Sequence, residues 1–327
     1  MKVVNACVVC GSRKLSKRFG QFAPFVAHRI ADYPMGTINI GGQTLHPPLF
    51  TNSMRCEDCG FVFSQIRFED DELQRLYQDY RGPEYTRVRN FFEPGYDKLN
   101  ERIGSSPLEV RNRAAALMGF LQGVVDPRSR TSVLDYGGDM GQHIPQDFGH
   151  CRKFVYDISR VATVDGVSIV NDVSGLGVMD FVICSNVLEH VPYPARVIDD
   201  IKKVCGPDTV LFVDVPLEMN PAQDPPDQEI PAFFHEHVNY FTPRSINALL
   251  RYHGFSTLKT ELFTIDMGWV TGHAIYVLAR PSWFVTVTQN APQPAAPNAA
   301  PNAAPKAAPE ASAASAAAAL LAGAQAR

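Results

Sequence analysis

The stretch Ser132-Val133-Leu134-Asp135-Tyr136-Gly137-Gly138-Asp139-Met140-Gly141 decides the fold of this chain. An apolar run ends in a carboxylate, and three glycines follow it within six residues. This pattern predicts a buried parallel strand that breaks into a tight turn, whose backbone can approach a ligand closely. The dinucleotide-binding fingerprint G-x-G-x-x-G does not fit, because the glycines stand at 137, 138 and 141. The stretch is therefore interpreted as a cofactor-binding turn of another kind, with a glycine-rich turn of an unrelated α/β protein as the alternative.

Further apolar runs, each bounded by turn residues, follow this stretch along the chain. Together they predict buried parallel strands at 132–136, 153–158, 167–170, 180–185 and 209–215. A helix is predicted before them at 107–122, and two antiparallel strands after them at 256–265 and 272–279. The predicted fold class is α/β, with a Rossmann-like, mostly parallel sheet and an antiparallel closing strand. The short segments between the first three strands leave room only for truncated helices.

Two C-x-x-C pairs, Cys7 with Cys10 and Cys56 with Cys59, are each followed by a glycine. The two-residue spacer lets both sulfurs face one ion, and the glycine permits a turn that aims backbone N–H groups at thiolate. Four thiolates close a tetrahedral shell, so the predicted ion is a structural zinc. The alternative is a set of redox-active or incidental cysteines. The other three of the seven cysteines are predicted to be core thiols: Cys151, Cys184 and Cys205.

Composition places the chain among ordinary globular proteins, with 45% hydrophobic and 20% charged residues in 327. A net charge of -4 with scattered Lys and Arg argues against a nucleic-acid partner. No apolar run suggests a secretory signal or a membrane span, so a cytoplasmic location is expected. The predicted organisation is a zinc-binding module (1–68), a helical connector (69–105), a catalytic domain (106–283) and a disordered Ala/Pro-rich tail (284–327).

Two motifs resemble class I S-adenosylmethionine (SAM) methyltransferases. Asp135, Gly137 and Gly141 match the acidic-x-Gly-x-Gly-x-Gly pattern of their first motif, and Asp139 stands where the middle glycine is usual. An aspartate tolerates a left-handed backbone, so the turn can survive this departure. Residues 185–191 read S-N-V-L-E-H-V, similar to the segment of that family that borders the methyl-transfer cleft. The resemblance implies SAM as cofactor, bound by Asp135, Gly137 and Gly141.

Two further carboxylates follow predicted strands. Asp157 comes about twenty residues after the glycine-rich turn, where a carboxylate can accept hydrogen bonds from both hydroxyls of a ribose. Asp172 follows the next strand and is predicted either to accept from the adenine amino group or to lie in a solvated turn. The pair Glu189 and His190 is expected to make contacts at the start of a helix, with a chemical role as the alternative.

The last motif reads F-F-H-E-H-V-N-Y-F-T-P over residues 233–243 and follows a proline- and acid-rich stretch (216–231) predicted to be a lid or wall of the cleft. Residues 236–243 of this motif resemble the Glu-His-x-x-Tyr-Phe-x-Pro stretch of SAM methyltransferases that carry an N-terminal zinc domain and act on nucleotide-linked sugars. That resemblance implies His237 as general base and Glu236 as its partner at the substrate site. Tyr240 and Phe241 are expected to limit the access of water. A metal site here lacks the spacing of H-E-x-x-H. Thr242 is predicted to cap the next helix.

The sequence therefore predicts a SAM-dependent methyltransferase acting on a small polar substrate, such as a nucleotide-linked sugar or glycan precursor. One alternative is a non-catalytic binding protein that keeps the zinc module and the SAM fold. Another is a methyltransferase of protein or nucleic acid, in which the zinc module recruits the polymer. The C-terminal domain usual in sugar C-methyltransferases has no counterpart in the Ala/Pro-rich tail, which leaves the sugar and the methylated atom open.

Overall fold

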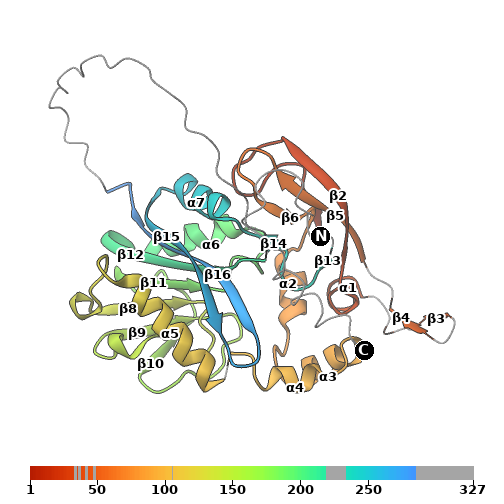
Figure 1. The fold of residues 1–327 in the computed structure, drawn as a ribbon, viewed down its shortest axis with the longest axis horizontal. Coiled ribbons are helices and arrows are strands. Elements are labelled where there is room, and N and C mark those ends of the chain that lie inside the picture. Colours follow the sequence, from red (N-terminus) through yellow and green to blue (C-terminus); the bar gives the residue numbers. More distant parts are fainter. Residues whose placement is uncertain are drawn as a thin grey trace, which may run out of the picture. The chain divides into compact units, whose positions relative to one another are not determined.

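The computed structural model describes residues 1–32, 35, 38–40, 43–46, 49–104, 106–218 and 233–284. All of them fall in one compact unit, Met1–Val285 (Figure 1). The predicted lid therefore lies outside the described residues except for 216–218, and so does the predicted tail except for Phe284. No helix in the described part of the chain combines the length and apolar character needed to cross a membrane.

The described residues build a central sheet of seven strands in the order β10-β9-β8-β11-β12-β16-β15. Their bounds are β8 (Ser132–Tyr136), β9 (Arg152–Tyr156), β10 (Val167–Val170), β11 (Met179–Ser185), β12 (Cys205–Pro216), β15 (Phe255–Asp266) and β16 (Thr271–Pro281). The first five strands of this order pair in parallel, and β16 pairs antiparallel with both β12 and β15. The predicted fold class is confirmed. Strand β9 ends two residues before the predicted 158.

Two apolar layers cover the two faces of this sheet, because successive residues of a strand point to opposite sides. Leu134 and Val182 face a core that includes helices α6 (Pro194–Ile201) and α7 (Pro243–Tyr252). Their strand neighbours face a second core with helix α5 (Pro107–Leu121). Only short turns follow β8 and β9, including the 3-10 turn η2 (Gln146–Phe148), as the short segments predict. Cys151, Cys184 and Cys205 are buried, as expected of core thiols.

The N-terminal part contains a second sheet in the order β13-β2-β5-β6-β14. Its elements and those around it are β1 (Lys2–Val3), β2 (Leu15–Phe22), α1 (Pro24–Ala31), β3 (Ile38–Ile40), β4 (Gln43–Leu45), β5 (Leu49–Cys56), β6 (Val62–Ser64), β7 (Ile66–Arg67), β13 (Phe233–Phe234) and β14 (Asn239–Tyr240). Strands β13 and β14 come from the far C-terminal side of the sequence and pair with β2 and β6. The module is thus completed by the segment that carries the predicted catalytic residues.

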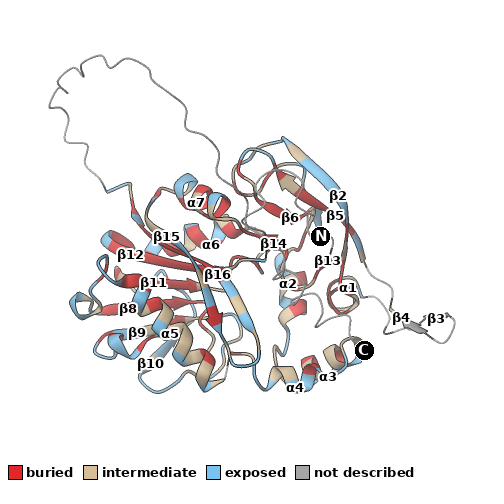
Figure 2. Cartoon of the chain, viewed as in Figure 1, coloured by how far each residue is buried: buried red, intermediate tan, exposed pale blue. Residues whose placement is uncertain are grey.

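Three helices form the connector between this sheet and α5: α2 (Asp70–Tyr77), α3 (Pro83–Phe92) and α4 (Tyr96–Asn100). Helix α2 begins with a capping box between Glu69 and Glu72, which satisfies two of the backbone donors at its first turn. The buried faces of α2 and α3 (Figure 2) share an aromatic core with α1 and the 233–240 segment. Thr242 caps α7 as predicted, through a capping box with Ser245.

Candidate active site

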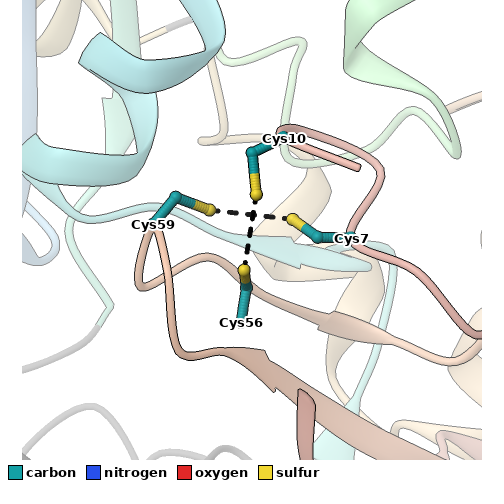
Figure 3. Close-up of side chains that lie close together, drawn as sticks. All are labelled: Cys7, Cys10, Cys56 and Cys59. Carbon is teal, nitrogen blue, oxygen red and sulfur yellow. Dashed lines mark hydrogen bonds between the residues drawn. The ribbon is translucent and has the colours of Figure 1, made fainter. Parts of the chain in front are cut away.

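The four predicted zinc ligands converge on one point (Figure 3). The Sγ atoms of Cys7 and Cys59 lie 3.6 Å apart, those of Cys10 and Cys56 lie 3.5 Å apart, and all four are within 4.8 Å of one another. The glycine after each pair has a positive φ and donates its N–H to the carbonyl of the first cysteine at 2.8 Å. Four convergent sulfurs at two tight turns fit a tetrahedral zinc ion, which thiolate ligands favour.

A cavity of about 1720 Å³ lies along the carboxyl ends of β8, β9 and β11. The connector helices and the segment 236–237 form its other walls. Of the residues predicted to bind cofactor or act on substrate, those lining it are Asp135, Gly137, Asp157, Glu236 and His237. Gly141, Asp172 and Tyr240 do not line it. Ligands of parallel α/β sheets bind at this edge, so the cavity is the candidate active site.

The glycine-rich turn requires its glycines for packing as well as for access. Gly137 has φ +77°, and a Cβ there would lie 2.3 Å from Cγ2 of Val187. Gly141 has φ +78°, and a Cβ there would lie 2.9 Å from Val155. Asp139 adopts φ 52°, a left-handed conformation that aspartate tolerates better than most residues. The turn therefore forms with an aspartate in place of the middle glycine.

Asp157 follows β9 directly and holds the glycine-rich turn in place. One carboxylate oxygen accepts from the N–H of Asp139 at 3.0 Å, and the other accepts from the N–H of Ser159 at 2.7 Å. Each oxygen keeps a lone pair for a ligand hydroxyl. Burial, together with the charges of Asp157 and Asp139, raises the pKa of Asp135 to about 7. These residues fit a ligand that brings hydroxyl groups and positive charge to this edge.

Asp172 lies away from the cavity. Its carboxylate is exposed and accepts from both the N–H and the hydroxyl of Ser174, and this hydrogen bonding lowers its pKa. The neighbouring Asn171 lines the cavity instead. These contacts are those of the solvated-turn alternative, and the adenine contact stays a prediction.

His237 reaches the cavity with a carboxylate partner that the sequence did not indicate. Its Nδ1 lies 2.9 Å from a carboxylate oxygen of Glu218, at the end of the described part of the predicted lid. Burial lowers the pKa of His237, but Glu218 and the nearby Glu189 and Glu236 outweigh burial and raise this pKa to about 9. The bond at Nδ1 leaves Nε2 as the ring nitrogen that can accept a hydrogen bond when the imidazole is neutral.

Glu236, expected to orient His237, is bound to the connector. It accepts from the hydroxyl of Tyr85 and from Arg89 at 2.8 Å. Burial would raise its pKa, but His235 and Arg89 hold the pKa well below its usual range. The orienting contact at His237 belongs to Glu218 instead. Tyr240 donates to the carbonyl of Phe233 at 2.9 Å within the aromatic core, so its role in limiting water stays a prediction.

Glu189 and His190 also line the cavity, and the expectation of a helix start is wrong. The next helix, α6, begins only at Pro194, and the backbone carbonyl of Glu189 accepts from the N–H groups of Val238 and Asn239 in the segment 233–240. The His190 Nδ1 lies 2.9 Å from the Tyr77 hydroxyl, and its ring centroid is 4.5 Å from that of His237. Glu189 is 1% exposed, and neither of its carboxylate oxygens has a hydrogen-bond partner among the described residues. Burial raises its pKa to about 8.

Comparison with known proteins agrees with this geometry. Residues 108–260 match the family model of a methyltransferase domain. No curated protein matches the chain.

Solved structures with a similar fold include the 1,6-didemethyltoxoflavin N1-methyltransferase of Burkholderia thailandensis, with 16% identity and a TM-score of 0.43 over 70% of this chain and 98% of that one. A SAM-dependent methyltransferase of Aquifex aeolicus has 15% identity and a TM-score of 0.39, over 56% of this chain and 97% of that one. A glycopeptide N-methyltransferase has 13% identity and a TM-score of 0.41, over 54% of this chain and 95% of that one.

The methyltransferase match spans the strands whose carboxyl ends line the cavity, including the glycine-rich turn and the Glu189–His190 turn. The matched residues, 108–260, also include α7 and His237. The protein is a SAM-dependent methyltransferase.

Proposed function

We propose that the enzyme methylates a small polar acceptor, and that nucleotide-linked sugars and related glycan precursors are the class it uses. The observation that carries the first part is that one cavity is lined by both the glycine-rich turn and His237. An in-line displacement needs donor and acceptor aligned in one enclosed space. The sugar class is supported by the resemblance of the Glu236–His237 motif to that of zinc-domain methyltransferases.

The cofactor supplies, when bound, a methyl group activated by a sulfonium. Asp157 would hold its ribose, and Asp135, Gly137 and Gly141 would shape the turn beside it. His237 would take the acceptor's proton on Nε2, while Glu218 keeps the other nitrogen hydrogen-bonded. Loss of that proton would leave the acceptor with an electron pair for the methyl group that the bound cofactor would supply. The four cysteines would hold a structural zinc away from this reaction.

The test is to incubate the full chain with SAM labelled on the methyl group and a panel of nucleotide-linked sugars, and to detect methylated product by mass. We expect label in a sugar, and much less with His237→Gln. Label transferred only to added protein or nucleic acid would overturn the acceptor class. Isothermal titration that detects no SAM binding would favour a non-catalytic binding protein.

A further inference from the structure

Arg67 is a fully buried arginine at the joint between the N-terminal module and the catalytic domain. It ends β7 and is 1% exposed. Its Nε donates to the carbonyl of Pro192 at 2.7 Å, and Nη1 donates to the carbonyls of Ser64 at 3.2 Å and Val238 at 3.1 Å. Its Nη2 donates to the Pro192 carbonyl and to Oδ1 of Asn239. All five guanidinium N–H donors are thus used.

None of these acceptors, all in the described part of the chain, is a carboxylate. Burying a guanidinium without a counter-charge is costly, and burial lowers the pKa of Arg67 to about 9. Apolar side chains could fill such a joint at a lower cost. The distinctive property of arginine here is a rigid fork of directed donors, which fixes the relative positions of the backbone segments that accept from it.

Asn239, the first residue of β14, completes the same network. It is 0% exposed, and its Nδ2 donates to the carbonyls of Leu188 and Val191, both at 2.7 Å. The backbone N–H groups of Val238 and Asn239 both donate to the carbonyl of Glu189, at 2.9 and 3.1 Å. The turn that carries Glu189 and His190 is therefore bound along its whole length by Arg67 and by the residues that directly follow His237.

We propose that Arg67 and Asn239 are positioning residues that hold His237 against the Glu189–His190 turn, so that the N-terminal module sets the geometry of the active site. Strand β6 lies between Cys59 and Arg67 and pairs with β14 through Phe63 opposite Asn239. A continuous path of hydrogen-bonded backbone thus runs from the cysteine cluster to the catalytic segment. This inference rests on the proposed role of His237, but its test needs no acceptor.

The test follows the His237 ring by NMR in full-length protein labelled with ¹⁵N-histidine, with His237→Gln used to assign the signal. In Arg67→Lys, which keeps the charge but loses the fork, we expect the pKa of His237 to move by about one pH unit or more toward its ordinary value near 6.5. Because the glycine-rich turn is not part of this network, the SAM dissociation constant should stay within about twofold of wild type.

The matched control is Phe181→Leu, which destabilises the central sheet at a buried position outside the network. It should lower the melting temperature without moving the His237 signal. Asn239→Ser removes the two amide donors and should shift the pKa of His237 in the same way as Arg67→Lys. This second variant tests the proposal even if Arg67→Lys does not fold. A His237 signal that stays at its wild-type position and pKa in the folded variant would overturn the proposal and leave Arg67 and Asn239 as packing residues.

Discussion

Turnover should rise with pH over the physiological range and level off only near pH 9, because a general base must be neutral to accept a proton. Burial lowers the pKa of His237, but the carboxylates around it, Glu218 first, raise it to about 9. A base with that pKa is neutral in only about 1% of molecules at pH 7. We therefore expect kcat/KM to rise about tenfold per pH unit from about pH 7 to about pH 9.

Glu218→Gln is the perturbation that isolates this effect. The amide keeps an oxygen that can accept from Nδ1 at the 2.9 Å contact but removes the charge. Removing an opposite charge at this distance should lower the pKa of His237 by about one unit or more. At pH 7 the neutral fraction then rises about tenfold or more, so the variant should outperform the wild type at pH 7 and not at pH 9.

The free energy of unfolding should also depend on the titration of His237, but it should fall as the pH rises, whereas turnover rises. The folded-state pKa of His237 lies above the unfolded value near 6.5. The ion pair with Glu218 therefore stabilises the wild type fully below about pH 6.5, and this contribution is lost as the pH rises through about 9. Both side chains are 32% exposed, so solvent screening keeps the contribution small.

The assay measures the initial rate of methyl transfer with labelled SAM and the identified acceptor, from about pH 6 to about pH 10. A separate measurement at each pH verifies that the protein stays folded. The matched control is Glu93→Gln, which removes a carboxylate from His235 in the same segment and should leave the midpoint unchanged. A wild-type midpoint near 6.5, or one that Glu218→Gln does not move, would refute the assignment of His237 as a base controlled by Glu218.

Three other substitutions test the remaining sites. Purified protein should contain about one zinc per chain, and Cys59→Ser should lower both the metal content and the melting temperature; folded protein without metal would contradict the zinc site. Asp157→Ala should weaken SAM binding by roughly 1.5 to 3 kcal/mol in a titration, because a hydrogen bond to a charged group is lost. His237→Ala should reduce turnover by about a hundred- to ten-thousand-fold at unchanged SAM affinity, and retention of more than about a tenth of wild-type turnover would exclude it as the base.

The sequence predicts the central sheet well because its strands carry strong local signals. Each apolar run between turn residues becomes a strand, and β8 has the predicted bounds of 132–136. The end of β9 is shifted because Asp157 leaves the strand to accept two backbone N–H groups. That shift depends on where the glycine-rich turn lies in space, which no local pattern contains.

The cysteine cluster could also be predicted, because the C-x-x-C spacing itself brings two sulfurs to one side of a turn. The carboxylate partner of His237 could not. Glu236 is adjacent in sequence, yet its side chain is taken by Tyr85 and Arg89 from the connector. Glu218, nineteen residues away, makes the contact. Sequence proximity is a poor guide here, because residues 235–238 form an irregular segment between β13 and β14 and adjacent side chains contact different parts of the molecule.

The segment 233–240 joins the predicted catalytic motif to the N-terminal module that carries the cysteine cluster. Its two short strands pair with opposite edges of the module's sheet, β13 with β2 and β14 with β6. The residues between them, including Glu236 and His237, must therefore cross from one edge to the other. A link of this kind has little freedom, because both of its ends are hydrogen-bonded to the same rigid sheet. In the central sheet alone the segment would be an unpaired loop before α7. If His237 takes the acceptor's proton as proposed, the module sets the geometry that this transfer requires, while the carboxyl ends of β8 and β9 line the same cavity.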